Sequence, residues 1–274
     1  MHPTLRLLFS VTSGLLLSLA WYPSWGIIGL FVAFVPLLLI EEFYLTSKKC
    51  VLGVFNYSYL TFLIWNTLTT YWIYKATPIG VVLAILANSG LMAFVFWLYH
   101  LSRRITNKKV GRYALIIWWL AFEHIYFHTE ISWPWLTLGN AFADNVSLIQ
   151  WYEYTGPLGG SLWVLIINIL LVSLISELAT NNRLHNRKAM TNGILIGLIL
   201  AIPIVLSQII YTQYKEQGND NEIVVLQPNI DPYHEKFSAM GEIEQLTRLI
   251  QLADQSITHN TKFVVGPETA LIET

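Results

Sequence analysis

The chain has 274 residues, 54% of them hydrophobic and only 12% charged, with a formal net charge of −1 and a mean hydropathy of +0.51. Ordinary soluble domains carry about 25% charged residues. This composition therefore excludes an ordinary soluble protein and is typical of a membrane protein. The balanced charge gives no basic surface for nucleic acid, and the single cysteine excludes an internal disulfide and a cysteine-based zinc cluster.

Long uncharged runs predict transmembrane helices. A helix needs about 20 mostly apolar residues to cross a bilayer. We predict seven spans, at about 5–21, 26–43, 51–73, 79–101, 112–129, 157–177 and 191–211. The first two come from one uncharged run, interrupted by an aromatic turn at residues 21–26. The fold class expected for residues 1–214 is therefore a polytopic α-helical membrane domain.

The distribution of basic residues predicts the orientation of these spans. Eleven lysines and arginines fall in one set of loops: Arg6, Lys48, Lys49, Arg103, Arg104, Lys108, Lys109, Arg112, Arg183, Arg187 and Lys188. The alternate loops hold only Lys75. Because basic loops stay cytoplasmic, the N-terminus is predicted inside and everything after residue 214 outside. In a two-membrane bacterium this means a multi-pass inner-membrane protein with a periplasmic C-terminal domain.

The first span has an alternative interpretation. Arg6, the apolar run after it and Ser18-Leu19-Ala20 also fit a cleaved signal peptide. Loss of that span would leave the orientation of the others unchanged. Sequencing the mature N-terminus distinguishes the two possibilities.

The composition changes after a polar linker at residues 215–221. Residues 222–227 predict a buried strand, residues 241–257 have the apolar spacing of a helix, and residues 262–265 predict a second strand. Strand, helix and strand in this order form a βαβ unit, which builds parallel sheets. Three elements make no complete core, so residues 222–274 are expected to begin a larger α/β domain.

Glu268 follows the second predicted strand directly after Gly266 and Pro267. Active sites of open α/β folds collect at the carboxyl ends of parallel strands, so a general base is one interpretation of this residue. A helix-capping or salt-bridging carboxylate is the other, and the residues alone do not decide between them.

Several motifs together resemble a known family. Gln227-Pro228-Asn229 after a strand, then Lys236, a helix, and a strand leading into Pro267-Glu268-Thr269-Ala270 resemble the opening of a nitrilase-type (carbon–nitrogen hydrolase) domain. Seven helices before such a domain resemble the apolipoprotein N-acyltransferase family. Trp119-x-x-x-Glu123, Pro134-Trp135-Leu136 and Tyr71-Trp72-Ile73-Tyr74 are similar to that family as well.

The resemblance implies transfer of a fatty acyl chain from a phospholipid to the N-terminal amine of a diacylated apolipoprotein, through a thioester on the enzyme. The family uses Glu, Lys and Cys, and Glu268 stands at the Glu position. The Lys and Cys positions have no counterpart within these residues, so the 274-residue chain is expected to be C-terminally truncated and inactive. No metal and no organic cofactor is implied.

Other residues are expected to flank the site or contact lipid. The resemblance places Gln227, Asn229, Lys236 and Phe237 near the catalytic centre, with Phe237 where the family often has Trp. Glu123 is interpreted as structural support at the outer end of its span, or as an ordinary interfacial residue. Trp135 belongs to an outer segment that is either a lipid-contacting lip or a plain aromatic belt.

Two rival functions belong to other classes. A membrane-tethered nitrilase-type amidase would share the fold but act on a small amide. A polytopic transporter or scaffold is disfavoured because the spans show no paired charges and no matched Gly/Pro-interrupted helices.

Overall fold

The computed structural model divides the chain into two compact units, residues 1–214 and residues 215–274. It describes residues 1–22, 26–47, 49–106, 110–130, 133–181, 187–215, 218, 221–230 and 241–267.

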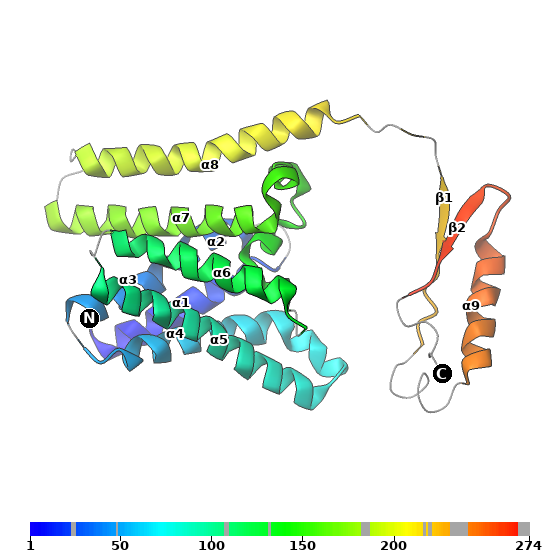
Figure 1. Cartoon of the computed structure of the whole chain (residues 1–274), viewed down its shortest axis with the longest axis horizontal. Coiled ribbons are helices and arrows are strands. Elements are labelled where there is room, and N and C mark those ends of the chain that lie inside the picture. The colour runs from blue at the N-terminus through cyan, green and yellow to red at the C-terminus, as the bar shows by residue number, and fades with distance from the viewer. Residues whose placement is uncertain are drawn as a thin grey trace. The chain divides into compact units, whose positions relative to one another are not determined.

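Unit 1 is a helical bundle (Figure 1). Its α-helices are α1 (Pro3–Leu19), α2 (Gly26–Ala33), α3 (Val35–Thr46), α4 (Leu52–Thr70), α5 (Pro78–Ile105), α6 (Ala114–His128), α7 (Tyr152–Asn181) and α8 (Arg187–Gln213). Short 3₁₀ helices join them: η1 (Tyr71–Lys75), η2 (Val110–Tyr113), η3 (Pro134–Leu136), η4 (Leu138–Phe142) and η5 (Val146–Leu148). Helices therefore occupy all seven stretches for which spans were predicted, and the second stretch contains two of them.

Four helical segments of the described chain are long and apolar enough to cross a membrane: Gly26–Thr46, Pro78–Ile105, Tyr152–Ala179 and Arg187–Gln213. The others fall short for identifiable reasons. α6 has 15 residues, about 22 Å at 1.5 Å per residue, against a hydrocarbon core of about 30 Å. α1 has 17 residues, and α4 carries several Asn, Ser and Thr side chains. The chain is a multi-pass membrane protein, with four of the seven predicted spans meeting this criterion.

The second predicted span is broken between α2 and α3, where Pro36 removes a backbone donor. In a continuous helix the Phe34 N–H would donate to the Leu30 carbonyl. Instead Asn168 of α7 inserts its amide between them: Phe34 N donates to Asn168 Oδ1 at 2.9 Å, and Asn168 Nδ2 donates to Leu30 O at 3.0 Å. The break is therefore satisfied by a neighbouring helix, as lipid surroundings require.

A layer of buried aromatic rings joins four segments at the centre of unit 1. Phe34, Phe62, Phe96 and Trp119 are each 0% exposed and come from the α2–α3 break, α4, α5 and α6. Phe34 packs edge-on against Trp119 with 5.1 Å between ring centroids, and Phe62 lies 5.4 Å from Trp119. Edge-to-face and tilted contacts of this kind are the favoured aromatic geometries.

Unit 2 contains the predicted βαβ order, with β1 (Glu222–Val225), α9 (Glu242–Ser256) and β2 (Thr261–Val265). β1 and β2 pair in parallel, with Ile223 opposite Phe263 and Val225 opposite Val265, which confirms this part of the prediction. Both strands leave apolar side chains exposed: Val225 is 73% and Phe263 59% accessible. Parallel sheets normally have both faces covered, so this pair has the surface of an interior sheet.

Glu222 links the start of β1 to the turn before β2. Thr258 Oγ1 donates to Glu222 Oε1 at 2.6 Å, and the Thr261 hydroxyl donates to the same oxygen. These hydrogen bonds favour the ionised carboxylate and lower the pKa of Glu222 below its usual value. A lowered pKa gives stability that is present above the unfolded-state pKa and lost as the pH falls through the folded-state pKa.

We therefore expect the protection of the Leu226 amide, which donates to Val265 O at 2.8 Å, to depend on pH. Hydrogen exchange should show that this protection decreases between about pH 5 and pH 3 in the wild type. In Glu222→Gln the protection should be lower than in the wild type and should not change over this range. The exposed Glu244 of α9 provides the control, because Glu244→Gln should keep the wild-type profile. An unchanged profile in Glu222→Gln would contradict the role of these hydrogen bonds.

Candidate functional site: an aromatic cavity and its outer lip

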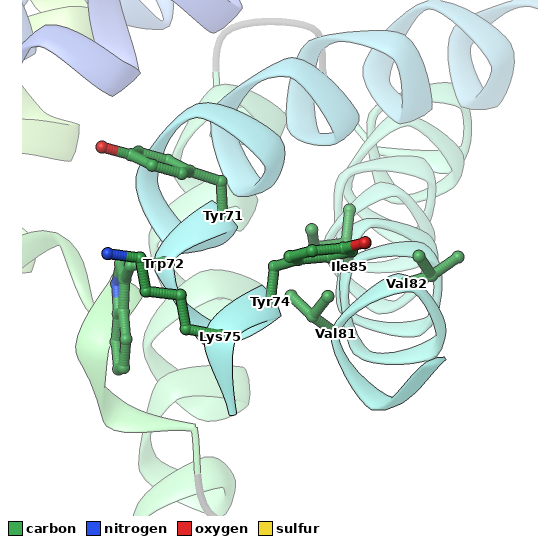
Figure 2. A pocket seen from close by; sticks show the side chains of 7 residues that line it. All are labelled: Tyr71, Trp72, Tyr74, Lys75, Val81, Val82 and Ile85. Atoms are coloured by element: carbon green, nitrogen blue, oxygen red, sulfur yellow. The ribbon is translucent and has the colours of Figure 1, made fainter. Parts of the chain in front are cut away.

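An apolar cavity of about 570 Å³ lies between η1 and the first turns of α5. It is lined by Tyr71, Trp72, Tyr74 and Lys75 of η1 and by Val81, Val82 and Ile85 of α5. In Figure 2 Tyr74 reaches from η1 toward α5, whereas Trp72 and Lys75 extend from the opposite side of η1. The volume falls within the range of small-molecule pockets, and Lys75 is the only charged side chain among the lining residues that the structure describes.

The local sequence explains why the chain turns here. α4 ends at Thr70 and continues as the tighter η1, which leads into Thr77. The Thr77 hydroxyl accepts a hydrogen bond from Gly80 N at 3.2 Å, and Pro78 occupies the first turn of α5. An N-cap threonine followed by proline is a strong helix start, so the two walls of the cavity are fixed by one short turn.

Trp135 extends the aromatic edge of the cavity. Its ring is 48% exposed and lies 6.0 Å from Trp72, a lining residue, and 5.0 Å from Trp133. The Trp135 carbonyl accepts a hydrogen bond from Trp21 Nε1 at 2.9 Å. Trp135 therefore joins the segment after α6 to the rim of the cavity and to the end of α1.

Glu123 of α6 holds the segment that contains Trp135 in place. The side chain is 3% exposed, and its Oε1 accepts hydrogen bonds from Trp119 Nε1 at 3.0 Å and from Leu138 N at 2.9 Å. Leu138 is the first residue of η4. The carboxylate thus connects α6 to the backbone that follows Trp135, which is the geometry of a supporting residue.

α7 holds the other side of the segment. Gly139 N donates to Ser161 Oγ at 2.9 Å, and Tyr152 Oη donates to Gly139 O at 3.0 Å. A Cβ on Gly139 would lie 1.9 Å from the Pro157 carbonyl oxygen, so only glycine allows this close approach. The lip, defined here as residues 133–142, is consequently pinned by Glu123 on one side and by α7 on the other.

The residues predicted to flank a catalytic centre in unit 2 are only partly described. Gln227 and Asn229 are both exposed on the loop after β1, on either side of the buried Pro228. Asn229 has a φ of 51°, in the left-handed region that asparagine tolerates better than most residues. Glu268, Lys236 and Phe237 lie outside the described residues.

Comparison with known proteins identifies the family. The sequence model of the apolipoprotein N-acyltransferase N-terminal domain matches residues 13–170, which is 158 of the 274 residues. The chain belongs to the apolipoprotein N-acyltransferase family. An apolipoprotein N-acyltransferase of Chlorobaculum tepidum is 26% identical over 272 residues, covering 94% of this chain and 48% of the relative. The chain thus spans about half the length of that relative. A search of solved structures found no match to this chain.

The family match covers the cavity, Glu123 and Trp135 but not the βαβ unit. The resemblance inferred from the residues is therefore confirmed at the level of the family, which is a family of acyltransferases. The match therefore places the aromatic cavity and its lip within the N-terminal domain that characterises this family.

A buried ion network was missed by the sequence analysis. Glu41 of α3 is 0% exposed and accepts hydrogen bonds from Arg103 and, at 2.8 Å, from His100 Nδ1, the latter assignment depending on the ring tautomer. Glu42 Oε2 pairs with Arg103 at 3.0 Å and with Arg112 at 3.3 Å. The prediction that the spans carry no paired charges is wrong.

The physical reason for this error lies in the helix ends. The predicted span 26–43 includes Glu41, whereas the predicted span 79–101 ends before Arg103 and leaves it in a loop. α5 continues to Ile105, so Arg103 lies on a helix facing α3 and is 2% exposed. The network is fully interhelical, which favours a packing role over the open charge arrays of transporters.

Removing the Glu123 carboxylate tests the support role. Glu123→Ala leaves the Trp119 and Leu138 N–H groups buried without an acceptor, at about 1–3 kcal/mol each, so we expect about 2–6 kcal/mol loss in the free energy of unfolding. The Leu138 amide should also lose its protection in hydrogen exchange. Glu123→Gln retains an acceptor oxygen and should keep most of both, as should Glu130→Ala at the exposed end of the same segment. If the Leu138 amide were as protected in Glu123→Ala as in the wild type, the support role of Glu123 would be contradicted.

Proposed function

We propose that this chain is the membrane domain of an apolipoprotein N-acyltransferase together with the opening of its nitrilase-like catalytic domain. The reaction is transfer of an acyl chain from a phospholipid to the N-terminal amine of a diacylated apolipoprotein. The observation that carries the proposal is the aromatic cavity: an apolar space of about 570 Å³ with one cation, Lys75, among its lining residues.

The chemistry of the lining matches a phospholipid. Val81, Val82 and Ile85 offer an aliphatic wall, and Tyr74 covers it from η1. Lys75 supplies a positive charge for the lipid phosphate. Tyrosine and tryptophan at this position also suit the membrane interface, where an apolar ring and a polar edge meet both environments.

The proposed topology has seven spans. α1, α4 and α6 are part of the same bundle as the four segments that meet the length criterion, because α1 packs on α4, α4 on α5, and α6 on both α5 and α7. With basic loops inside, the N-terminus is cytoplasmic in the bacterial inner membrane. The same topology puts Lys75, Trp135 and everything after residue 214 on the periplasmic side.

Glu268 is the proposed general base. It would remove the proton of a cysteine thiol, and the thiolate would attack the ester carbonyl of the phospholipid. The ester C–O bond breaks, the lysophospholipid leaves with the proton, and a thioester remains. The acceptor amine then attacks the thioester carbonyl, the C–S bond breaks to form the amide, and the proton lost by the amine returns the cysteine to its thiol. Gln227, Asn229, Lys236 and Phe237 are proposed to flank this centre.

The nucleophile of this mechanism has no counterpart within residues 1–274. Cys50, the single cysteine, is exposed beside Lys49 and belongs to the predicted cytoplasmic side. Residues 1–274 by themselves are therefore proposed to bind donor lipid without transferring its acyl chain.

Photo-crosslinking tests the proposed donor site. The purified chain in nanodiscs containing a phosphatidylethanolamine with a photoactivatable acyl chain should give cross-links in η1 and the first turns of α5. Lys75→Ala should weaken labelling about twofold to fivefold, the effect of losing one exposed charge contact. Lys49→Ala is the matched control, since Lys49 lies at the opposite end of the bundle. Labelling unaffected by Lys75→Ala, or spread evenly over the lipid-facing helices, would overturn the donor site.

A further inference from the structure

A chain of buried side-chain hydrogen bonds crosses α4, α5 and α6. Tyr126 Oη of α6 donates to Asn88 Oδ1 of α5 at 2.8 Å, and Asn88 Nδ2 donates to Asn66 Oδ1 of α4 at 2.6 Å. Asn66 is 0% and Asn88 3% exposed. Two paired amides in an otherwise apolar helix interface demand an explanation, because burying them is favourable only while the hydrogen bonds are made.

The bridge lies one helical turn inward from the cavity. Val81 and Ile85 line the cavity, and Asn88 follows them on the same face of α5, three residues after Ile85. On the other wall, Asn66 precedes η1 by about one turn, and Thr70 Oγ1 donates to the Asn66 carbonyl at 2.6 Å. The Asn66–Asn88 hydrogen bond therefore joins α4 to α5 about one helical turn from the residues that line the cavity.

We infer that the Asn66–Asn88 bridge is the floor of the cavity and sets the length of acyl chain that the cavity accepts. This inference rests on the proposed function, which places a donor acyl chain between η1 and α5. An aliphatic chain cannot replace amide hydrogen bonds, so a longer chain cannot displace the bridge without leaving Asn66 Oδ1 and Asn88 Nδ2 without their partners. The Asn66–Asn88 bridge is thus expected to resist displacement by an acyl chain.

Two substitutions at Asn88 distinguish an effect on the depth of the cavity from an effect on the stability of the helical bundle. Asn88→Ala and Asn88→Leu remove the same hydrogen bonds, but alanine leaves space for roughly two methylenes whereas leucine refills it. If the side chain is a floor, only alanine should lengthen the preferred chain. If the bridge merely stabilises the bundle, both variants should behave alike.

The experiment measures lipids retained by the full chain. The protein is purified from an equimolar mixture of phosphatidylethanolamines with saturated chains of 14, 16 and 18 carbons, and the bound lipids are quantified by mass spectrometry. Asn88→Ala should raise the ratio of retained 18-carbon to 16-carbon lipid about threefold to tenfold over wild type. Asn88→Leu should leave this ratio unchanged or lower it. Asn66→Ala, on the opposite wall, should shift it in the same direction as Asn88→Ala.

The outcomes distinguish this inference from the proposed function. Retention that depends on Lys75 but shows the same length profile in Asn88→Ala and Asn88→Leu would overturn the floor and leave the donor site standing. Retention that is insensitive to Lys75→Ala would overturn the donor site, and the floor with it. Should Asn88→Ala not fold, Asn66→Ala alone decides: an unchanged ratio overturns the floor.

Discussion

Arg103→Ala is expected to destabilise unit 1 by about 3–5 kcal/mol, the cost of removing the central cation of a buried ion network. The Arg103 guanidinium is the group shared by Glu41 and Glu42, so its loss uncovers negative charge on α3. The free energy of unfolding in mixed micelles, measured by denaturant titration, gives this quantity directly.

The neighbouring arginine is the control for this prediction. Arg104 is exposed, so Arg104→Ala should stay within about 0.5 kcal/mol of wild type. Adding Glu41→Gln to Arg103→Ala should recover part of the loss, because it removes the uncompensated charge. A similar effect of both arginine substitutions would show that the network contributes little.

The second large effect concerns the proposed base. In a protein that contains these residues and continues the catalytic domain, Glu268→Gln should lower acyl transfer about 10²–10⁴-fold, the usual contribution of general acid–base catalysis. A glutamine amide cannot take the thiol proton. The rate of lysophospholipid release reports the step, and retention of phospholipid should not change.

Glu244→Gln on α9 is the matched control, and the variant that carries it should transfer acyl chains at the wild-type rate. If Glu268→Gln kept more than about a tenth of the activity, Glu268 would be a structural carboxylate, the other interpretation that its sequence context allowed.

The helices were predictable because the bilayer imposes one dominant requirement, a long apolar run for each span. The parallel β1–α9–β2 unit was predictable for a similar reason, since apolar spacing changes from continuous to helical and back. Lengths at the ends were less certain. The extension of α5 to Ile105 moved Arg103 from a predicted loop onto a helix.

Contacts between distant residues were not predictable from one sequence. Asn168 and Phe34 are 134 positions apart, and no local pattern at Asn168 indicates that its amide completes the break between α2 and α3. Glu123 was recognisable as a costly carboxylate at membrane depth, but its partner is the backbone N–H of Leu138, and backbone partners leave no residue signature. The aromatic run of η1 was visible, whereas the cavity needed the α5 wall.

The most direct test of the proposed function is acylation of the acceptor. A protein comprising these residues and the rest of the catalytic domain is incubated with phosphatidylethanolamine and a diacylglyceryl-cysteine peptide, and the peptide is analysed by mass spectrometry. We expect the peptide to gain one acyl chain on its N-terminal amine, with one lysophospholipid released for each, and residues 1–274 alone to produce neither. An unmodified peptide together with hydrolysis of small amides would contradict the proposed function and favour an amidase.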